Sequence, residues 1–105
     1  MEKPINDAAG EQPLRLALPA CYQHLVDQLA LDHLHSYDVK ASVIPQDAGY
    51  LIALRFGEGW TQGKQQYFAN EDLDHLTIKL TDFFKEIAQA CKKALIADYF
   101  KMMKP

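Results

Sequence analysis

The chain has 105 residues, a formal net charge of −3, and a composition of 49% hydrophobic and 24% charged residues. These values are typical of one small globular domain, and a chain of this length buries roughly two-thirds of the surface that its unfolded form exposes. The acidic balance excludes a general electrostatic attraction to phosphate backbones or to anionic membranes.

The sequence contains no signal for secretion or membrane insertion. No apolar run reaches the ~18 residues of a membrane span, and the first ten residues lack the apolar core of a signal peptide. We therefore expect a cytoplasmic protein with no membrane contact. Cys21 and Cys91 are too few for the disulfide framework of a secreted domain, and both lie among apolar residues of predicted helices. We expect both to be buried free thiols.

The N-terminal part divides into a polar segment and a short leucine-rich segment. Residues 1–13 are polar and contain Gly10 and two prolines, so we expect a flexible tail followed by a single α+β domain over 14–105. Leu14, Leu16 and Leu18 then alternate with other residues. This pattern fits either a short strand or an extended lead-in whose leucines pack on the core.

The next segment has the period of a first helix, from about residue 20 to residue 35. Pro19 suits the first helical turn, where a missing backbone N–H costs nothing. Tyr22, Leu25, Val26 and Leu29 follow at steps of three or four, which places them on one helical face. Polar residues 36–38 end the helix.

Three strands are predicted after this helix. Residues 39–43 alternate apolar and polar side chains, whereas residues 50–56 are apolar on both faces and are expected to form the central strand. Residues 46–49 supply a turn with Asp and Gly between them. Residues 65–69 form a plausible third strand with Tyr67 or Phe68 turned inward. The short connections favour an antiparallel meander.

One long helix is predicted over residues 70–103. Asn70 is a suitable N-cap, acidic residues follow at the positive end of the helix dipole, and lysines gather at the other end. Apolar residues recur at steps of three or four: Leu73, Leu76, Leu80, Phe83, Ile87, Cys91, Leu95 and Tyr99. At ~1.5 Å per residue the helix is about 50 Å long, so its end overhangs a sheet of ~25 Å, unless it breaks near Ala94.

The predicted fold is a two-layer α+β domain, with a three-stranded antiparallel meander, one helix before it and one long helix after it. This α-β-β-β-α order resembles the double-stranded-RNA-binding domain in topology. The resemblance implies basic residues at the start of the last helix, which grip phosphates. Here Glu71, Asp72 and Asp74 stand there and repel them. Nucleic-acid binding stays an alternative function, with lysines at the end of the helix as a second route: Lys92, Lys93, Lys101 and Lys104.

Catalytic, cofactor and metal sites are not indicated. Cys21 and His24 are three residues apart on a helix, a spacing that allows a nucleophile and a base to meet. No oxyanion-hole or Gly-rich signature, phosphate loop or CxxC accompanies them. His33 and His35 point away from each other on a helix and do not converge on a metal. We favour a protein that is not an enzyme and has no cofactor or metal. A small enzyme or ligand-binding domain, with a pocket between helix and sheet that includes Cys21 and His24, stays an alternative.

The strongest functional signal is a set of large apolar residues without obvious cover. Trp60 lies in the glycine-flanked loop 57–63, and aromatic residues and methionines crowd the end of the long helix. Aromatic side chains are enriched among interface anchors, and methionine adapts to partner surfaces. We therefore predict an adaptor or regulator that binds another protein, or itself as a homodimer, through five residues: Trp60, Tyr99, Phe100, Met102 and Met103.

Overall fold

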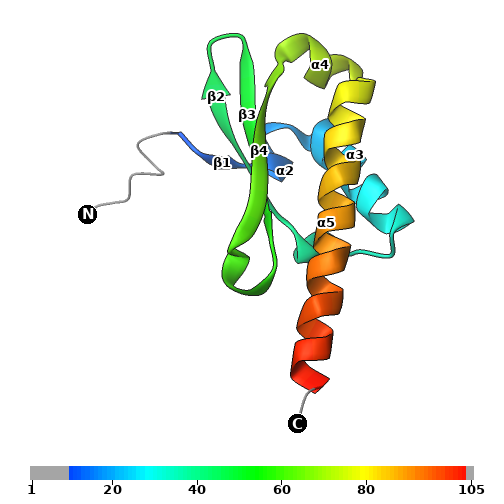
Figure 1. The fold of residues 1–105 in the computed structure, drawn as a ribbon. Helices are drawn as coiled ribbons and strands as arrows, with labels where there is room; N and C mark the ends of the chain where they lie inside the picture. The colour runs from blue at the N-terminus through cyan, green and yellow to red at the C-terminus, as the bar shows by residue number, and fades with distance from the viewer. Residues whose placement is uncertain (1–9, 104–105) are drawn as a thin grey trace, which may run out of the picture.

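The computed structural model describes residues 10–103, and their side chains as far as Tyr99. It is an α+β fold in which a four-stranded antiparallel sheet carries its helices on one face (Figure 1). Along the chain the elements are β1 (Gln12–Pro13), α2 (Leu14–Ala17), α3 (Pro19–Leu31), η1 (Ser36–Asp38), β2 (Lys40–Gln46), β3 (Gly49–Phe56), η2 (Glu58–Trp60), β4 (Gln62–Ala69), α4 (Asn70–His75) and α5 (Ile78–Met103). Within the described chain, no helix combines the length and apolar content that a membrane span needs.

The central hairpin follows the sequence prediction. β2 and β3 pair antiparallel from Gln46 opposite Gly49 to Lys40 opposite Arg55, across a two-residue turn. β3 lies between β2 and β4, as its apolar residues on both faces predict. Alternate β3 residues, such as Ile52, face the helices and are buried. The hairpin therefore fixes which side chains reach the core and which face outward.

The expectation of three strands was wrong, because a fourth strand precedes the first helix. β1 pairs antiparallel with β2, with Gln12 opposite Val43 and Pro13 opposite Ser42. A strand of two residues that includes a proline shows no periodicity, so it gave no signal. β1 lies at the end of the expected tail, residues 1–13, whereas residues 1–9 lie outside the described residues.

The leucine-rich segment forms neither a strand nor an extended lead-in. It is the helical turn α2, in which the N–H of Leu18 donates to the carbonyl of Leu14 at 2.8 Å. Leu14 is fully buried, whereas Leu16 is 65% exposed. The alternating leucines therefore do not share one face.

The first helix ends four residues earlier than predicted. After Leu31, His33 adopts a left-handed conformation with φ 61°. The N–H of His33 donates to the carbonyl of Ala30, and that of Leu34 donates to the carbonyl of Leu29. This is the Schellman pattern of helix termination, and the apolar contact it requires comes from Leu34 and Leu29, which are both in the core.

The C-terminal segment is two helices and not one. α4 ends at Leu76, which is left-handed at φ 48° and ψ 56°, and α5 then runs unbroken to Met103, past Ala94. Asn70 is not an N-cap, because the chain enters α4 through Ala69 without a side-chain cap. The bend lets α4 contact the end of β3 and β4 while α5 crosses the sheet face (Figure 1).

The core lies between the inner face of the sheet and the helices. Its largest fully buried side chains come from every major element: Leu14, Leu25, Leu29, Val43, Ile52, Leu54, Phe68, Leu80, Phe84, Ile87 and Cys91. The rings of Phe68 and Phe83 lie 5.4 Å apart, centre to centre, and join β4 to α5. The predicted apolar face of the long helix is thus buried from Leu80 to Cys91, whereas Leu95 is 37% exposed.

Gly49 permits the close approach of β3 and β4. A Cβ at this position would lie 2.1 Å from the carbonyl oxygen of Phe68 and 2.8 Å from the Cα of Ala69. We predict that Gly49→Ala lowers the free energy of unfolding by about 1–3 kcal/mol, because the two strands must separate. Urea unfolding measures this, with Ala48→Ser in the exposed neighbouring turn as the control. Equal midpoints for the two variants would contradict the prediction.

Candidate functional site

Trp60 ends a tight turn that holds it in an uncommon backbone conformation. Gly57, Gly59 and Trp60 all have positive φ, of 82°, 66° and 56°. The N–H of Trp60 donates to the carbonyl of Gly57 at 3.0 Å, and the Thr61 hydroxyl donates to the carbonyl of Glu58 at 2.9 Å. A non-glycine residue in the left-handed region costs roughly 1–2 kcal/mol. Despite this fixed placement, the indole remains 42% exposed.

The turn places Trp60 beside the second half of α5. Trp60 and Leu95 line one hollow of about 260 Å³, which we call the Trp60 groove. Its lining residues are Tyr37, Asp38, Gly57, Glu58, Trp60, Leu95 and Asp98. The structure therefore brings two separately predicted features together, the aromatic loop and the overhanging helix.

The five predicted interaction residues do not all belong to this groove. Trp60 lines it, and Tyr99 follows Leu95 by four residues on the same helix, with 60% of its surface exposed. The side chains of Phe100, Met102 and Met103 lie outside the described residues. Sequence reasoning missed Tyr37, which is 74% exposed and stacks on His35 with ring centres 4.9 Å apart.

The Trp60 groove carries negative charge around its apolar side chains. Three carboxylates line it, those of Asp38, Glu58 and Asp98, and no lysine or arginine lines it among the side chains described, which end at Tyr99. Asp38 accepts the backbone N–H of His35 at 2.8 Å, which fixes its position at the edge of η1. The groove therefore combines an aromatic anchor with a surface that attracts cations.

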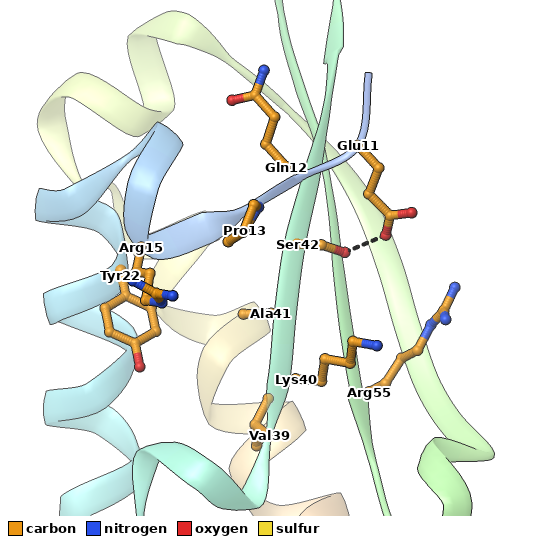
Figure 2. A pocket seen from close by; sticks show the side chains of 10 residues that line it. All are labelled: Glu11, Gln12, Pro13, Arg15, Tyr22, Val39, Lys40, Ala41, Ser42 and Arg55. Atoms are coloured by element: carbon orange, nitrogen blue, oxygen red, sulfur yellow. Dashed lines mark hydrogen bonds between the residues drawn. The ribbon is translucent and has the colours of Figure 1, made fainter. Parts of the chain in front are cut away.

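A second hollow, of about 420 Å³, opens where β1 ends against the outer edge of β2 (Figure 2). We call it the arginine pocket, because both arginines of the chain line it. Its lining residues are Glu11, Gln12, Pro13, Arg15, Tyr22, Val39, Lys40, Ala41, Ser42 and Arg55. No predicted site residue lies in this pocket.

Positive charge prevails in the arginine pocket. Arg15, Lys40 and Arg55 line it together with one carboxylate, that of Glu11, which accepts the hydroxyl of Ser42 at 2.6 Å. Figure 2 shows Lys40 and Arg55 on one side of β2 and Arg15 on the other. The ion pairs among residues 10–99 involve none of these three cations and are formed by lysines at positions 64, 79 and 92.

The Cys21 and His24 pair does not form a nucleophile and base. His24 Nε2 is hydrogen bonded to the Thr81 hydroxyl at 2.7 Å. Burial raises the pKa of the Cys21 thiol to about 12, so the thiolate needed for catalysis is not formed near neutral pH. Cys21 is instead a core side chain, with 2% of its surface exposed.

Cys91 is also a core residue. Burial, and secondarily the charge of Asp38, raise the pKa of its thiol to about 11, and its Sγ donates to the carbonyl of Asp38 at 3.7 Å. Both cysteines are free and buried, as predicted. Over the part of the chain that the structure describes, no three His, Cys, Asp or Glu side chains are grouped to hold a metal ion.

The comparisons with known proteins assign no family. The chain matches no protein-family model. No solved structure matches it. It is similar to phospholipase A1-Igamma2, chloroplastic, of Arabidopsis thaliana, with 33% identity over 89 residues, which cover 81% of this chain. The chain spans 17% of the length of that curated relative.

We predict that the buried thiol of Cys21 makes stability fall at high pH. Its pKa in the folded chain, about 12, lies above its ordinary value of 9.0. The unfolded chain therefore loses this proton first, and the free energy of unfolding decreases as the pH rises from about 9 toward 12. Urea midpoints at pH 8 and pH 10 measure the decrease, which we expect to be smaller in Cys21→Ala. An equal decrease in both proteins would contradict the prediction.

Proposed function

We propose that this chain is a small cytoplasmic protein-interaction module, an adaptor or regulator without enzymatic activity, which binds another protein through the Trp60 groove. The observation that carries the proposal is the placement of Trp60. Trp60 stays 42% exposed although a strained turn fixes its place in one hollow with Leu95 of α5. Strain of this kind persists where the surrounding structure fixes the conformation, and it clusters at functional sites. Of the three left-handed residues other than glycine within residues 10–103, His33 and Leu76 follow the ends of helices, whereas Trp60 lies in a loop.

The chemistry of the groove supports a protein partner. Tryptophan is among the residues that contribute most to protein interfaces, and it does so in pockets that exclude water on binding. Tyr37 and Leu95 line the same hollow as Trp60 and add apolar surface to it. A side chain inserted beside the indole thus meets apolar contact from two elements that are distant in sequence.

The carboxylates specify the charge of this partner. With Asp38, Glu58 and Asp98 around the indole, the groove favours a segment that carries lysine or arginine next to an apolar residue. A cation above the indole face gains a further cation–π attraction. A symmetric homodimer through this groove would place the same carboxylates opposite each other. The charge pattern therefore favours a different, basic protein over self-association.

Nucleic-acid binding and phospholipase activity both have less support at this groove than protein binding. Nucleic acid would meet the same carboxylates, and Lys92, in the middle of α5, forms an ion pair with Asp32 at 3.7 Å. We do not carry phospholipase activity over to this chain from the Arabidopsis protein. The chain has two serines, Ser36 and Ser42, and neither stands in the G-x-S-x-G motif of α/β-hydrolases.

The only tryptophan of the chain lies in the proposed site, so its fluorescence reports binding directly. We predict that Trp60→Ala loses a stoichiometric protein partner that the unmodified chain captures from nuclease-treated extract of its own cells. The partner should in turn shift the emission of Trp60 to shorter wavelength, because binding removes the indole from water. Loss of one such anchor costs about 2 kcal/mol or more, which is at least a roughly thirtyfold weaker Kd.

Tyr67 provides a matched control, because it is an aromatic side chain of equal exposure, 41%, on β4 and outside the groove. Tyr67→Ala should retain the partner and the emission shift. Capture that is equal for Trp60→Ala and Tyr67→Ala, with both variants folded, would refute the proposal. A complex that disappears with nuclease would point to nucleic acid, and a dimer without any second protein would point to self-association.

A further inference from the structure

The pairing of β2 with β3 sets two positive charges directly opposite each other. Lys40 and Arg55 are partners in the register, so their side chains share the face of the sheet that has no helix on it. Cβ atoms of such partners lie about 4.5–5.5 Å apart, and like charges there destabilise the pair. Both side chains are exposed, and neither is in an ion pair within the described residues.

The residues around Lys40 and Arg55 do not neutralise their positive charges. Gly63 lies opposite Arg55 on β4 and has no side chain to cover the guanidinium. Arg15 adds a third cation from the other side of β2, beside Tyr22 (Figure 2). A chain with a net charge of −3 thus collects both of its arginines and a lysine around one hollow.

The backbone at this point is also open. β1 covers β2 only at Ser42 and Val43, and the chain turns into α2 after Pro13. Lys40 and Ala41 therefore have no strand partner on their outer side within the described residues. In an antiparallel strand alternate residues turn their N–H and C=O to opposite edges. One of these two residues therefore turns its backbone N–H and C=O toward the edge of β2 that faces away from β3.

We infer that the arginine pocket binds a phosphate monoester carried by a small molecule or by a lipid headgroup. Arginine presents its donors in a planar fork that matches the oxygens of phosphate. Among residues 10–99 the lining has three cations and one carboxylate, a surplus of two positive charges, and a phosphate monoester carries about −1.5 to −2 at pH 7. Such a ligand removes the repulsion between Lys40 and Arg55. This inference is independent of the function proposed for the Trp60 groove.

The test is an NMR titration of the full chain with inorganic phosphate and with glycerol 3-phosphate, with sodium chloride adjusted to keep the ionic strength constant. We expect saturable shifts of the backbone amides of Lys40, Ala41 and Arg55. Lys40→Gln should weaken binding at least tenfold. Lys85→Gln removes the same charge from an exposed position on α5 outside the pocket and should stay within twofold of the unmodified chain.

A second measurement, of thermal unfolding, tests the repulsion between Lys40 and Arg55. Without phosphate, Lys40→Gln should raise the thermal midpoint, because one of two opposed charges is gone. At a phosphate concentration that saturates the unmodified chain, its midpoint should rise, and that of Lys40→Gln should rise less because its Kd is larger. This readout also verifies that the variant is folded.

Vesicles distinguish the two sources of the phosphate. Saturable binding of glycerol 3-phosphate supports a soluble ligand. Co-sedimentation with vesicles of phosphatidylcholine and phosphatidate, lost in Lys40→Gln but not in Lys85→Gln, supports a lipid headgroup when the soluble ester fails. The inference is overturned if neither probe binds, or if Lys40→Gln and Lys85→Gln respond alike.

Discussion

The two-residue turn between β2 and β3 is the constraint on which the rest of the structure depends. By setting Gln46 opposite Gly49, it fixes every later pair of the hairpin. If β2 slipped by one residue against β3, Val43 would move from the core to the open face of the sheet. Gly49 carries the constraint to the next strand, because only a residue without a Cβ lets Phe68 approach so closely. Core, sheet order and outer face thus follow from one local geometry.

The helices complete the fold through two left-handed residues that redirect the chain. His33 ends α3 and turns the chain toward η1, and Leu76 separates α4 from α5. Since α5 then crosses the sheet and continues past it (Figure 1), Leu95 arrives next to the turn that carries Trp60. The Trp60 groove exists because the helix is longer than the layer it covers.

The sequence allowed prediction of those parts that depend on local period and turn chemistry. Apolar runs located α3, the hairpin and the buried face of α5, because spacing alone decides which side chains share a face. It did not reveal β1, whose two residues are too few for a period, or the left-handed conformation of Leu76, which packing imposes on a residue that favours helix. For the site, composition drew attention to Trp60, but Tyr37 gave no signal because only the folded chain brings η1 beside α5.

The arginine pocket could not be predicted from the sequence for a different reason. The sequence predicted a turn over residues 46–49 but no register, and the structure sets Lys40 opposite Arg55 through a two-residue turn between Gln46 and Gly49. Arg15, in contrast, reaches the pocket only through β1 and α2, which no pattern predicted. The two candidate sites also share a physical character. Each retains a local cost, the backbone strain of Trp60 in one and the opposed charges of Lys40 and Arg55 in the other.

Backbone strain and opposed like charges both destabilise the fold, and such features are expected where a protein uses a residue for something besides folding. Arg55 connects the two sites, because it lines the arginine pocket and also a hollow beside Trp60. A change at Arg55 therefore alters both surroundings, whereas Lys40 belongs to the arginine pocket and to neither hollow that contains Trp60. The Trp60 groove is lined by carboxylates and the arginine pocket mainly by cations, so the two hollows favour ligands of opposite charge. One small sheet that is covered on a single face can thus present two surfaces of distinct chemistry without a second domain.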